Sequence, residues 1–200
     1  MKILIIGASG TIGSAITREL AKDTEVIQSS LNNPGFPVDL ASAESIKQLF
    51  KKTGKLDGVI CAAARGVVFK PVTKMLIADY QDSLQQKLFG QITVALESLN
   101  VLNDGGSITL TTGIMNHDFV KNGSAAAMTN NAVEGFAQSA ALAMPRNIRI
   151  NVVSPSLLQD SVETYADICP GFEAVSSEKV ARAFRKSVYG IQTGRVYHVK

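Results

Sequence analysis

The 200-residue sequence predicts an α/β fold, with a doubly wound, mainly parallel sheet of about seven strands and helices on both faces. Short apolar runs alternate with helical patterns along the chain, which is typical of parallel sheets joined by crossover helices. The first of these runs, at residues 2–6, is continuously apolar, as expected when both sheet faces are covered. With 46% hydrophobic and 18% charged residues, the chain reads as one globular domain over residues 1–200.

The first strand leads through a glycine-rich turn into the first helix. Lys2–Ile6 is apolar after its first residue, and Gly7–Gly13 follows at once. The helix is indicated by Ile12, Ile16 and Leu20, which recur at four-residue spacing. This layout places backbone N–H groups and the positive end of a helix dipole beneath a phosphate.

Each glycine of this turn has a predicted role. Gly7 permits the tight turn, Gly10 lets a pyrophosphate approach the backbone, and Gly13 lets the helix pack closely on the sheet. The spacing is G-x-x-G-x-x-G, unlike the usual G-x-G-x-x-G, and the alternative is a turn that binds nothing. The predicted dinucleotide-binding residues of the turn are Gly7, Ser9, Gly10, Thr11, Ile12 and Gly13.

The alternation of strand and helix continues to the end of the chain. We expect further strands at 25–29, 56–62, 107–112, 148–153 and 195–199. We expect helices at 42–52, 80–99, 125–144 and 177–189. Ser42 is a suitable N-cap for the first of these helices, and turn residues at 103–106 end the second. Pro145 and Asn147 end the third.

Ligands of doubly wound sheets bind beyond the carboxyl ends of the strands, at the switch point. Five segments of this chain should meet there, namely 7–13, 29–30, 61–64, 111–113 and 155–158. The cofactor-binding residues expected from the later segments are Ser29, Ser30, Cys61, Ala62, Ala63, Pro155 and Leu158.

The residues after the second strand bear on which dinucleotide binds. An acidic residue there would bond the adenosine ribose and reject a 2′-phosphate, but the sequence has Gln28-Ser29-Ser30-Leu31. No arginine follows either. Hydroxyl groups of Ser9, Ser29 and Ser30 can donate hydrogen bonds to a phosphate, so the sequence favours NADP over NAD.

Nearly the whole chain resembles the short-chain dehydrogenase/reductase family. The matching segments are the cofactor loop 7–13, Asp39-Leu40, Ala62-Ala63-Ala64, the active-site helix segment 132–136, the strand 149–155 and the last strand at 193–196. The resemblance implies a Rossmann-type NAD(P)-binding domain and an oxidoreductase activity. It also implies that Asp39 and Leu40 contact the adenine.

The family's catalytic Ser, Tyr, Lys and Asn do not all carry over. The resemblance places Ala126 in the Tyr position and Asn130 in the Lys position. Thr112, or Thr111, stands in the Ser position, and Lys87 in the Asn position. Alanine cannot move a proton, so the resemblance implies a non-standard active site.

Three residues are possible substitutes for the missing tyrosine. Lys87 is a cation whose pKa burial would lower, or else a structural or solvent-facing lysine. His117, in the loop after a strand, is a proton shuttle or a surface histidine. Tyr165 belongs to the segment where the family has a substrate lid, or is simply exposed. Our candidate catalytic residues are Thr112, Lys87, Asn130 and His117, with no metal ligand.

Three hypotheses of function follow. The first is an NAD(P)-dependent oxidoreductase acting on a small carbonyl or alcohol of unknown identity. The second is a catalytically inactive NADP(H)-binding sensor or scaffold, which the loss of the Tyr and Lys favours. The third is a structural oligomer that binds nothing, and the glycine-rich turn argues against it.

Charge and cysteine content exclude other classes. The net charge of +3 is too small to indicate nucleic-acid binding, and the lysines near residues 47–55 read as a solvated helix end. Cys61 and Cys169 form no disulfide framework, and no signal-peptide core or transmembrane run is found, so we expect a cytoplasmic protein. The resemblance implies a homodimer or homotetramer that uses the helices at 80–99 and 125–144.

Overall fold

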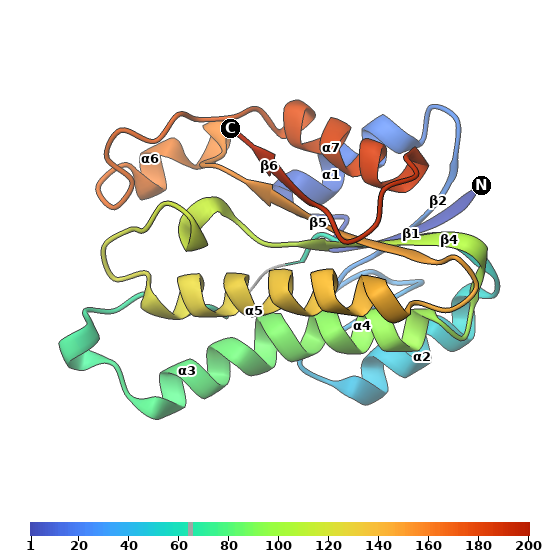
Figure 1. Ribbon diagram of the computed structural model, residues 1–200, viewed down its shortest axis with the longest axis horizontal. Helices are drawn as coiled ribbons and strands as arrows, with labels where there is room; N and C mark the ends of the chain where they lie inside the picture. The colour runs from blue at the N-terminus through green and yellow to red at the C-terminus, as the bar shows by residue number, and fades with distance from the viewer. Residues whose placement is uncertain (64–65) are drawn as a thin grey trace.

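The computed structural model describes residues 1–63 and 66–200. Its described residues form one fully parallel six-stranded sheet in the order β2-β1-β3-β4-β5-β6 (Figure 1). The strands are β1 (Lys2–Ile6), β2 (Glu25–Ser29), β3 (Leu56–Cys61), β4 (Leu102–Thr111), β5 (Arg149–Pro155) and β6 (Val196–Val199). The predicted α/β class is therefore confirmed. Ala64, part of one predicted motif, lies outside the described residues.

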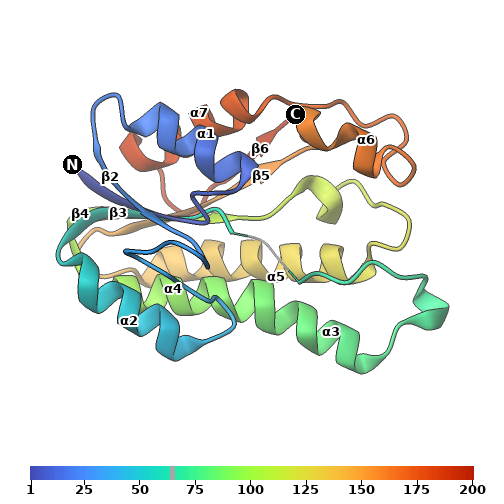
Figure 2. The same ribbon diagram turned by 180° about the vertical axis from the view of Figure 1, so that it is seen from behind.

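Helices cover both faces of the sheet (Figures 1 and 2). On one face α1 (Thr11–Leu20) packs beside α7 (Ser177–Tyr189), above a core that includes the fully buried Phe184. The helices of the other face are α2 (Ala43–Thr53), α4 (Gly90–Ser98) and α5 (Ser124–Ala140). The shorter helices are α3 (Ile77–Ser83) and α6 (Val162–Tyr165). Because both faces of the sheet are covered, Ile3–Ile6 of β1 are all buried, as the apolar run predicted.

The sheet has six strands in the described part of the chain, rather than about seven. Beyond β2 the chain makes only an isolated parallel bridge between Ser30 and Pro37. Proline has no N–H to donate to a ladder, which disfavours a further strand there. The Asn33 side chain accepts hydrogen bonds from the N–H groups of Gly35 and Phe36, at 2.9 and 2.8 Å, and so folds the loop compactly.

The helix predicted at 80–99 is three consecutive helical segments. Between α3 and α4, residues Leu84–Phe89 form a π-helical turn, η2, that contains Lys87. Such turns insert an extra residue and occur frequently at functional sites. The helix predicted at 125–144 ends as α5 at Ala140 and continues as a 3₁₀ turn. Ser42 caps α2 as predicted, since its side chain accepts from the Ser45 N–H.

Among residues 1–63 and 66–200, no helix combines the length and the apolar character that crossing a membrane requires.

Candidate active site

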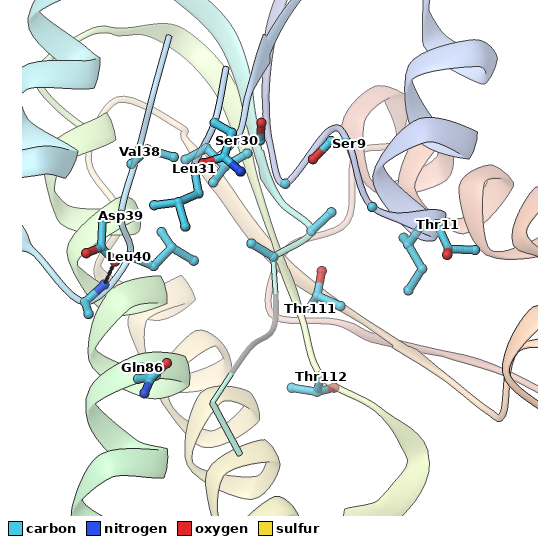
Figure 3. Close-up of a pocket in the computed structure, with 18 of the residues that line it drawn as sticks. Ser9, Thr11, Ser30, Leu31, Val38, Asp39, Leu40, Gln86, Thr111 and Thr112 are labelled. Atoms are coloured by element: carbon cyan, nitrogen blue, oxygen red, sulfur yellow. Dashed lines mark hydrogen bonds between the residues drawn. The ribbon is translucent and has the colours of Figure 1, made fainter. Parts of the chain in front are cut away.

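A cavity of about 530 Å³ lies at the carboxyl end of the sheet. Loops that follow β1, β2, β3 and β4 surround it, and η2 closes one side. Its lining residues are Ile6, Gly7, Ser9, Gly10, Thr11, Ile12, Ser30, Leu31, Asn32, Val38, Asp39, Leu40, Ala41, Ala62, Ala63, Gln86, Thr111, Thr112 and Leu158. Figure 3 shows Ser9 and Thr11 on one side of it, Asp39 and Gln86 on the other.

The cavity brings together most of the residues predicted to bind a dinucleotide. It also includes residues that the sequence reasoning missed, namely Ile6, Leu31, Asn32, Val38, Ala41 and Gln86. Leu31 and Asn32 directly follow a predicted segment, so extending that segment would have found them. No sequence pattern indicated that Gln86 lines the cavity, because its position depends on how η2 packs against the rest of the fold.

The glycine-rich loop presents an uncapped helix end to the cavity. Gly10 is the N-cap residue of α1, and neither a capping side chain nor an acidic residue is found in its first turn. The loop is tied to the sheet, because the N–H groups of Gly7 and Ala8 donate to the Ser29 carbonyl at 2.8 and 3.1 Å. The first N–H groups of a helix have no intrahelical partner, so this end can bind an anion.

Two glycines of the loop have no room for a side chain. A Cβ at Gly13 would lie 2.0 Å from the Gly7 carbonyl oxygen and 2.8 Å from Ala8 Cα. Gly7 has a φ of +85°, and a Cβ there would lie 2.7 Å from the Ala63 nitrogen. These contacts fit the close packing of turn, helix and strand that the sequence predicted for this loop.

Besides Gly13, three predicted cofactor residues do not line the cavity. Ser29 is fully buried, and its hydroxyl donates to the Phe36 carbonyl at 2.7 Å, so it is not available to a phosphate. Burial raises the pKa of the Cys61 thiol to about 12, and the Cys61 carbonyl accepts from the Thr111 hydroxyl at 2.6 Å. Pro155 is buried at the end of β5. The prediction that Ser29 binds a phosphate is therefore wrong, because the loop that brings Phe36 to Ser29 was not indicated by any local sequence pattern.

A buried carboxylate connects two of the predicted catalytic residues. The Thr112 hydroxyl donates to Glu134 Oε1 at 2.9 Å, and His117 Nε2 lies 2.9 Å from Glu134 Oε2. Glu134 is only 5% exposed, whereas the His117 side chain is 42% exposed and meets the His198 ring edge-on at 4.6 Å between centroids. Sequence reasoning missed Glu134 as a site residue, although it lies one helical turn after Asn130.

Lys87 is buried, which excludes the solvent-facing alternative. Burial lowers the pKa of its ammonium group to about 8, while Cys61 and Glu134 act in the opposite direction. The side chain of Lys87 therefore adds a partly titrating cation behind the cavity.

The other residues of the predicted site are placed as follows. Asn130 is fully buried on α5, and its Nδ2 donates to the Gly113 carbonyl at 3.0 Å. Its Oδ1 has no hydrogen-bond partner among residues 1–63 and 66–200. Ala126 is also buried. Tyr165 is 42% exposed on α6 and does not line the cavity, in agreement with the exposed alternative.

The parallel sheet with helices on both faces and the glycine-rich loop after β1 define a Rossmann-type domain. A family model described as enoyl-(acyl carrier protein) reductase matches residues 8–192. The chain belongs to the short-chain dehydrogenase/reductase family, in the group that this model describes.

Individual relatives agree with this assignment. The crystal structure of the protein lin1944 from Listeria innocua is 46% identical, with full coverage of both chains and a TM-score of 0.97. A small-chain dehydrogenase in complex with NADPH is 22% identical over 100% of this chain and 96% of that one, with a TM-score of 0.88, and shows the shared fold.

A curated relative is more distant and longer. Hydroxynaphthalene reductase-like protein Arp2 of Metarhizium brunneum is 27% identical over 177 residues, which cover 76% of this chain. The match spans 66% of that relative's length, so part of that longer protein has no counterpart in this chain.

Proposed function

We propose that the protein is an NAD(P)-dependent oxidoreductase with a non-standard active site, acting on a small carbonyl or alcohol. The observation that carries the proposal is the uncapped end of α1 beside the Thr112 hydroxyl, in one cavity. The family membership supports it, as does the name of the Metarhizium relative, which describes a reductase-like protein.

The residues of the cavity fit a dinucleotide. Close backbone packing at positions 7 and 13 holds the shape of the turn, while Gly10 leaves open space at the cavity that a Cβ would enter, and the first turn of α1 offers N–H groups to a pyrophosphate. Asp39 and Leu40 would contact the adenine. When bound, NAD(P) supplies or accepts the hydride.

Lys87 and Asn130 suggest how the site works without the family's Tyr and Lys. By the family resemblance, Lys87 on η2 stands where the family has an asparagine, and Asn130 on α5 stands where it has a lysine. The positive charge of the site would therefore come from η2 instead of α5. Lys87 supplies a buried cation behind the cavity, where it can stabilise charge that develops on a substrate oxygen. The Thr112 hydroxyl orients that oxygen.

The proposed preference for NADP depends on Ser9 and Ser30, which line the cavity, because Ser29 is engaged elsewhere. Replacing Ser30 with aspartate should weaken NADPH binding about tenfold or more, because a carboxylate repels the 2′-phosphate and bonds a free ribose hydroxyl instead. NADH binding should be kept or improved. Fluorescence titration of both cofactors measures this, and equal losses for both would contradict the assignment of Ser30 to the 2′-phosphate.

Turnover tests the proposed reaction. Wild-type protein with NADPH is mixed with a panel of small ketones, aldehydes and quinones, and the absorbance of reduced nicotinamide is followed. Lys87→Ala and His117→Ala should each reduce the rate, by about 10-fold or more, as expected for loss of charge stabilisation or proton transfer. Tight NADPH binding without turnover on any carbonyl would instead support the sensor or scaffold hypothesis, which the buried Ala126 at the tyrosine position motivates.

We also propose a homodimer or homotetramer. Phe89 and Leu96, at the end of η2 and on α4, are 47% and 54% exposed, and Leu142 after α5 is 90% exposed. Exposed apolar side chains on these helices fit a contact between copies of the chain.

A further inference from the structure

A polar row crosses three neighbouring strands at the carboxyl edge of the sheet. Ser154 of β5 pairs in register with His198 of β6. Thr111 pairs with Val153, so the next residue, Thr112, lies beside Ser154. The row therefore runs from the cavity wall at Thr112 to the edge strand at His198.

This row faces α5. Leu110 and Val152 pack in the same core as Val133 of α5. Side chains two residues apart on a strand share a face, so Thr112 and Ser154 also face that helix. The next residue of α5 after Val133 is Glu134, the carboxylate that bonds Thr112.

Glu134 links the cavity wall to the protein surface. Its two oxygens bond different partners, Thr112 on the cavity side and His117 on the outer side, both at 2.9 Å. Thr112 is 5% exposed and lines the cavity, whereas the His117 side chain is 42% exposed. The result is a hydrogen-bonded path of three side chains from a substrate-sized cavity to solvent.

The carboxylate at this position offers an opposite charge to the buried Lys87 ammonium, and it also has a chemical property that a neutral amide lacks. Burying a carboxylate is unfavourable unless it is bonded and paired, and a neutral amide would bond the same neighbours at lower cost. Unlike an amide, a carboxylate can take up and release a proton. Ser154 Oγ and Asn130 Oδ1, both fully buried, have no hydrogen-bond partner in the described part of the chain. Two polar atoms of this region are therefore available for further hydrogen bonds.

We propose that Glu134 and His117 carry protons between the Thr112 hydroxyl and solvent. The inference rests on the proposed oxidoreductase function. It assigns to these residues a positioning and proton-transfer role that acts through Thr112, and it makes Thr112 the group that touches the substrate oxygen.

The proton balance is simplest in the direction of alcohol oxidation. The O–H bond of the alcohol breaks and its proton passes to Thr112 Oγ1, while the Thr112 proton passes to Glu134 Oε1. The carbon–hydrogen bond breaks with its electron pair, as the hydride that the oxidised dinucleotide accepts, and a C=O bond forms. Once Glu134 is protonated, the partly exposed imidazole of His117 exchanges protons with water and becomes the Nδ1–H tautomer. Glu134 then turns its carboxyl group and gives its proton to the vacant Nε2, and Nδ1 releases its proton to water. Carbonyl reduction runs the same path in reverse.

The charged and titratable groups that interact with Glu134 come from three elements. Lys87 comes from η2, His117 from the loop after β4 and His198 from β6. Burial lowers the pKa of His198 below its usual value, and His117 lowers it further, whereas Glu134 acts in the opposite direction. The pKa of His198 therefore depends on the charges of His117 and Glu134, although His198 is not part of the proton path.

Nuclear magnetic resonance titration tests the path without any substrate. The chain has two histidines, His117 and His198, so their imidazole signals are readily assigned. Glu134→Gln should lower the pKa of His198 further, because a nearby opposite charge is lost, and His117→Gln should raise it. The exposed control Glu163→Gln should leave it unchanged. An unaltered His198 in both site variants would overturn the proposed network.

Turnover with NADPH and 9,10-phenanthrenequinone then tests proton transfer. Glu134→Gln should lower kcat about 10- to 100-fold, because the proton path is cut, while the Kd for NADPH changes less than about 2-fold. His117→Ala should lose rate that added imidazole restores in proportion to its concentration, since His117 is partly exposed. Full kcat in Glu134→Gln, or no imidazole rescue, would overturn the proton path.

This experiment distinguishes a failure of the proposed oxidoreductase function from a failure of the proton path. A wild type that oxidises no NADPH with the quinone contradicts the proposed function for this substrate class, and with it a catalytic proton path. An active wild type with unaffected variants contradicts the path alone.

Discussion

Replacing Lys87 with methionine is expected to raise the free energy of unfolding by about 3 kcal/mol at about pH 7. Burial lowers the pKa of the ammonium group from an ordinary value of 10.5 to about 8 in the folded protein. Each unit of this difference corresponds to about 1.4 kcal/mol by which the fold disfavours the charged lysine. Methionine fills similar space and carries no charge, so the variant should be more stable and less active.

The gain should depend on pH in a defined direction. Between about pH 8 and 10.5 the unfolded chain holds the Lys87 proton more tightly than the folded protein, so wild-type stability rises with pH there. The advantage of Lys87→Met therefore shrinks across this window and is lost near its upper end. Urea unfolding at both ends of the window measures the difference, with the exposed Lys47→Met as control. A gain that is absent, or equal at both pH values, would show that the ammonium is not desolvated.

Replacing Gly13 with alanine should destabilise the protein by about 3 kcal/mol or more and abolish cofactor binding. The new Cβ would lie 2.0 Å from the Gly7 carbonyl oxygen, so the glycine-rich loop or α1 must shift. Because backbone atoms form the contact, no side-chain rearrangement relieves it. Thermal or urea unfolding measures the loss of stability, and nicotinamide fluorescence measures binding.

Gly10→Ala is the matched control for Gly13→Ala. The atom nearest to its Cβ, the Gly7 carbonyl oxygen, is 3.5 Å away, which is an ordinary contact. The variant should fold with nearly wild-type stability yet bind NADPH about 10-fold or more weakly, because its methyl group would enter the space left for the pyrophosphate. Unchanged NADPH affinity in Gly10→Ala would contradict the placement of the pyrophosphate at this loop.

The sequence was sufficient for the fold class because hydrophobic pattern and turn residues are local signals. The strand from Lys2, the Ser42 cap and the glycine-rich turn were all predicted from neighbouring residues. The six strand segments expected from the sequence all occur in the sheet, whereas the total of about seven strands was one too many for the described residues. The π-helical turn around Lys87 was missed because its sequence spacing still resembles an ordinary helix.

The candidate site depended more on contacts between distant segments. Ser29 was predicted to bind a phosphate, but the following loop folds back on it, and the Ser29 hydroxyl donates to the carbonyl of Phe36, seven residues later. Glu134 drew no attention as a site residue because its partners Thr112 and His117 lie 22 and 17 residues earlier in the chain. Conversely, Thr112 was correctly placed at the cavity wall, because it directly follows a strand whose carboxyl end faces the ligand side.

The most direct test of the account is a titration of the purified protein with NADPH and with NADH, followed by nicotinamide fluorescence and thermal stability. We predict saturable binding of both, tighter for NADPH, and a stabilisation of about 2.7 kcal/mol at a hundred times the Kd. No fluorescence change and no stabilisation with either cofactor, at concentrations near the millimolar range, would contradict the account, because the fold would then have kept its glycine-rich loop without binding a dinucleotide.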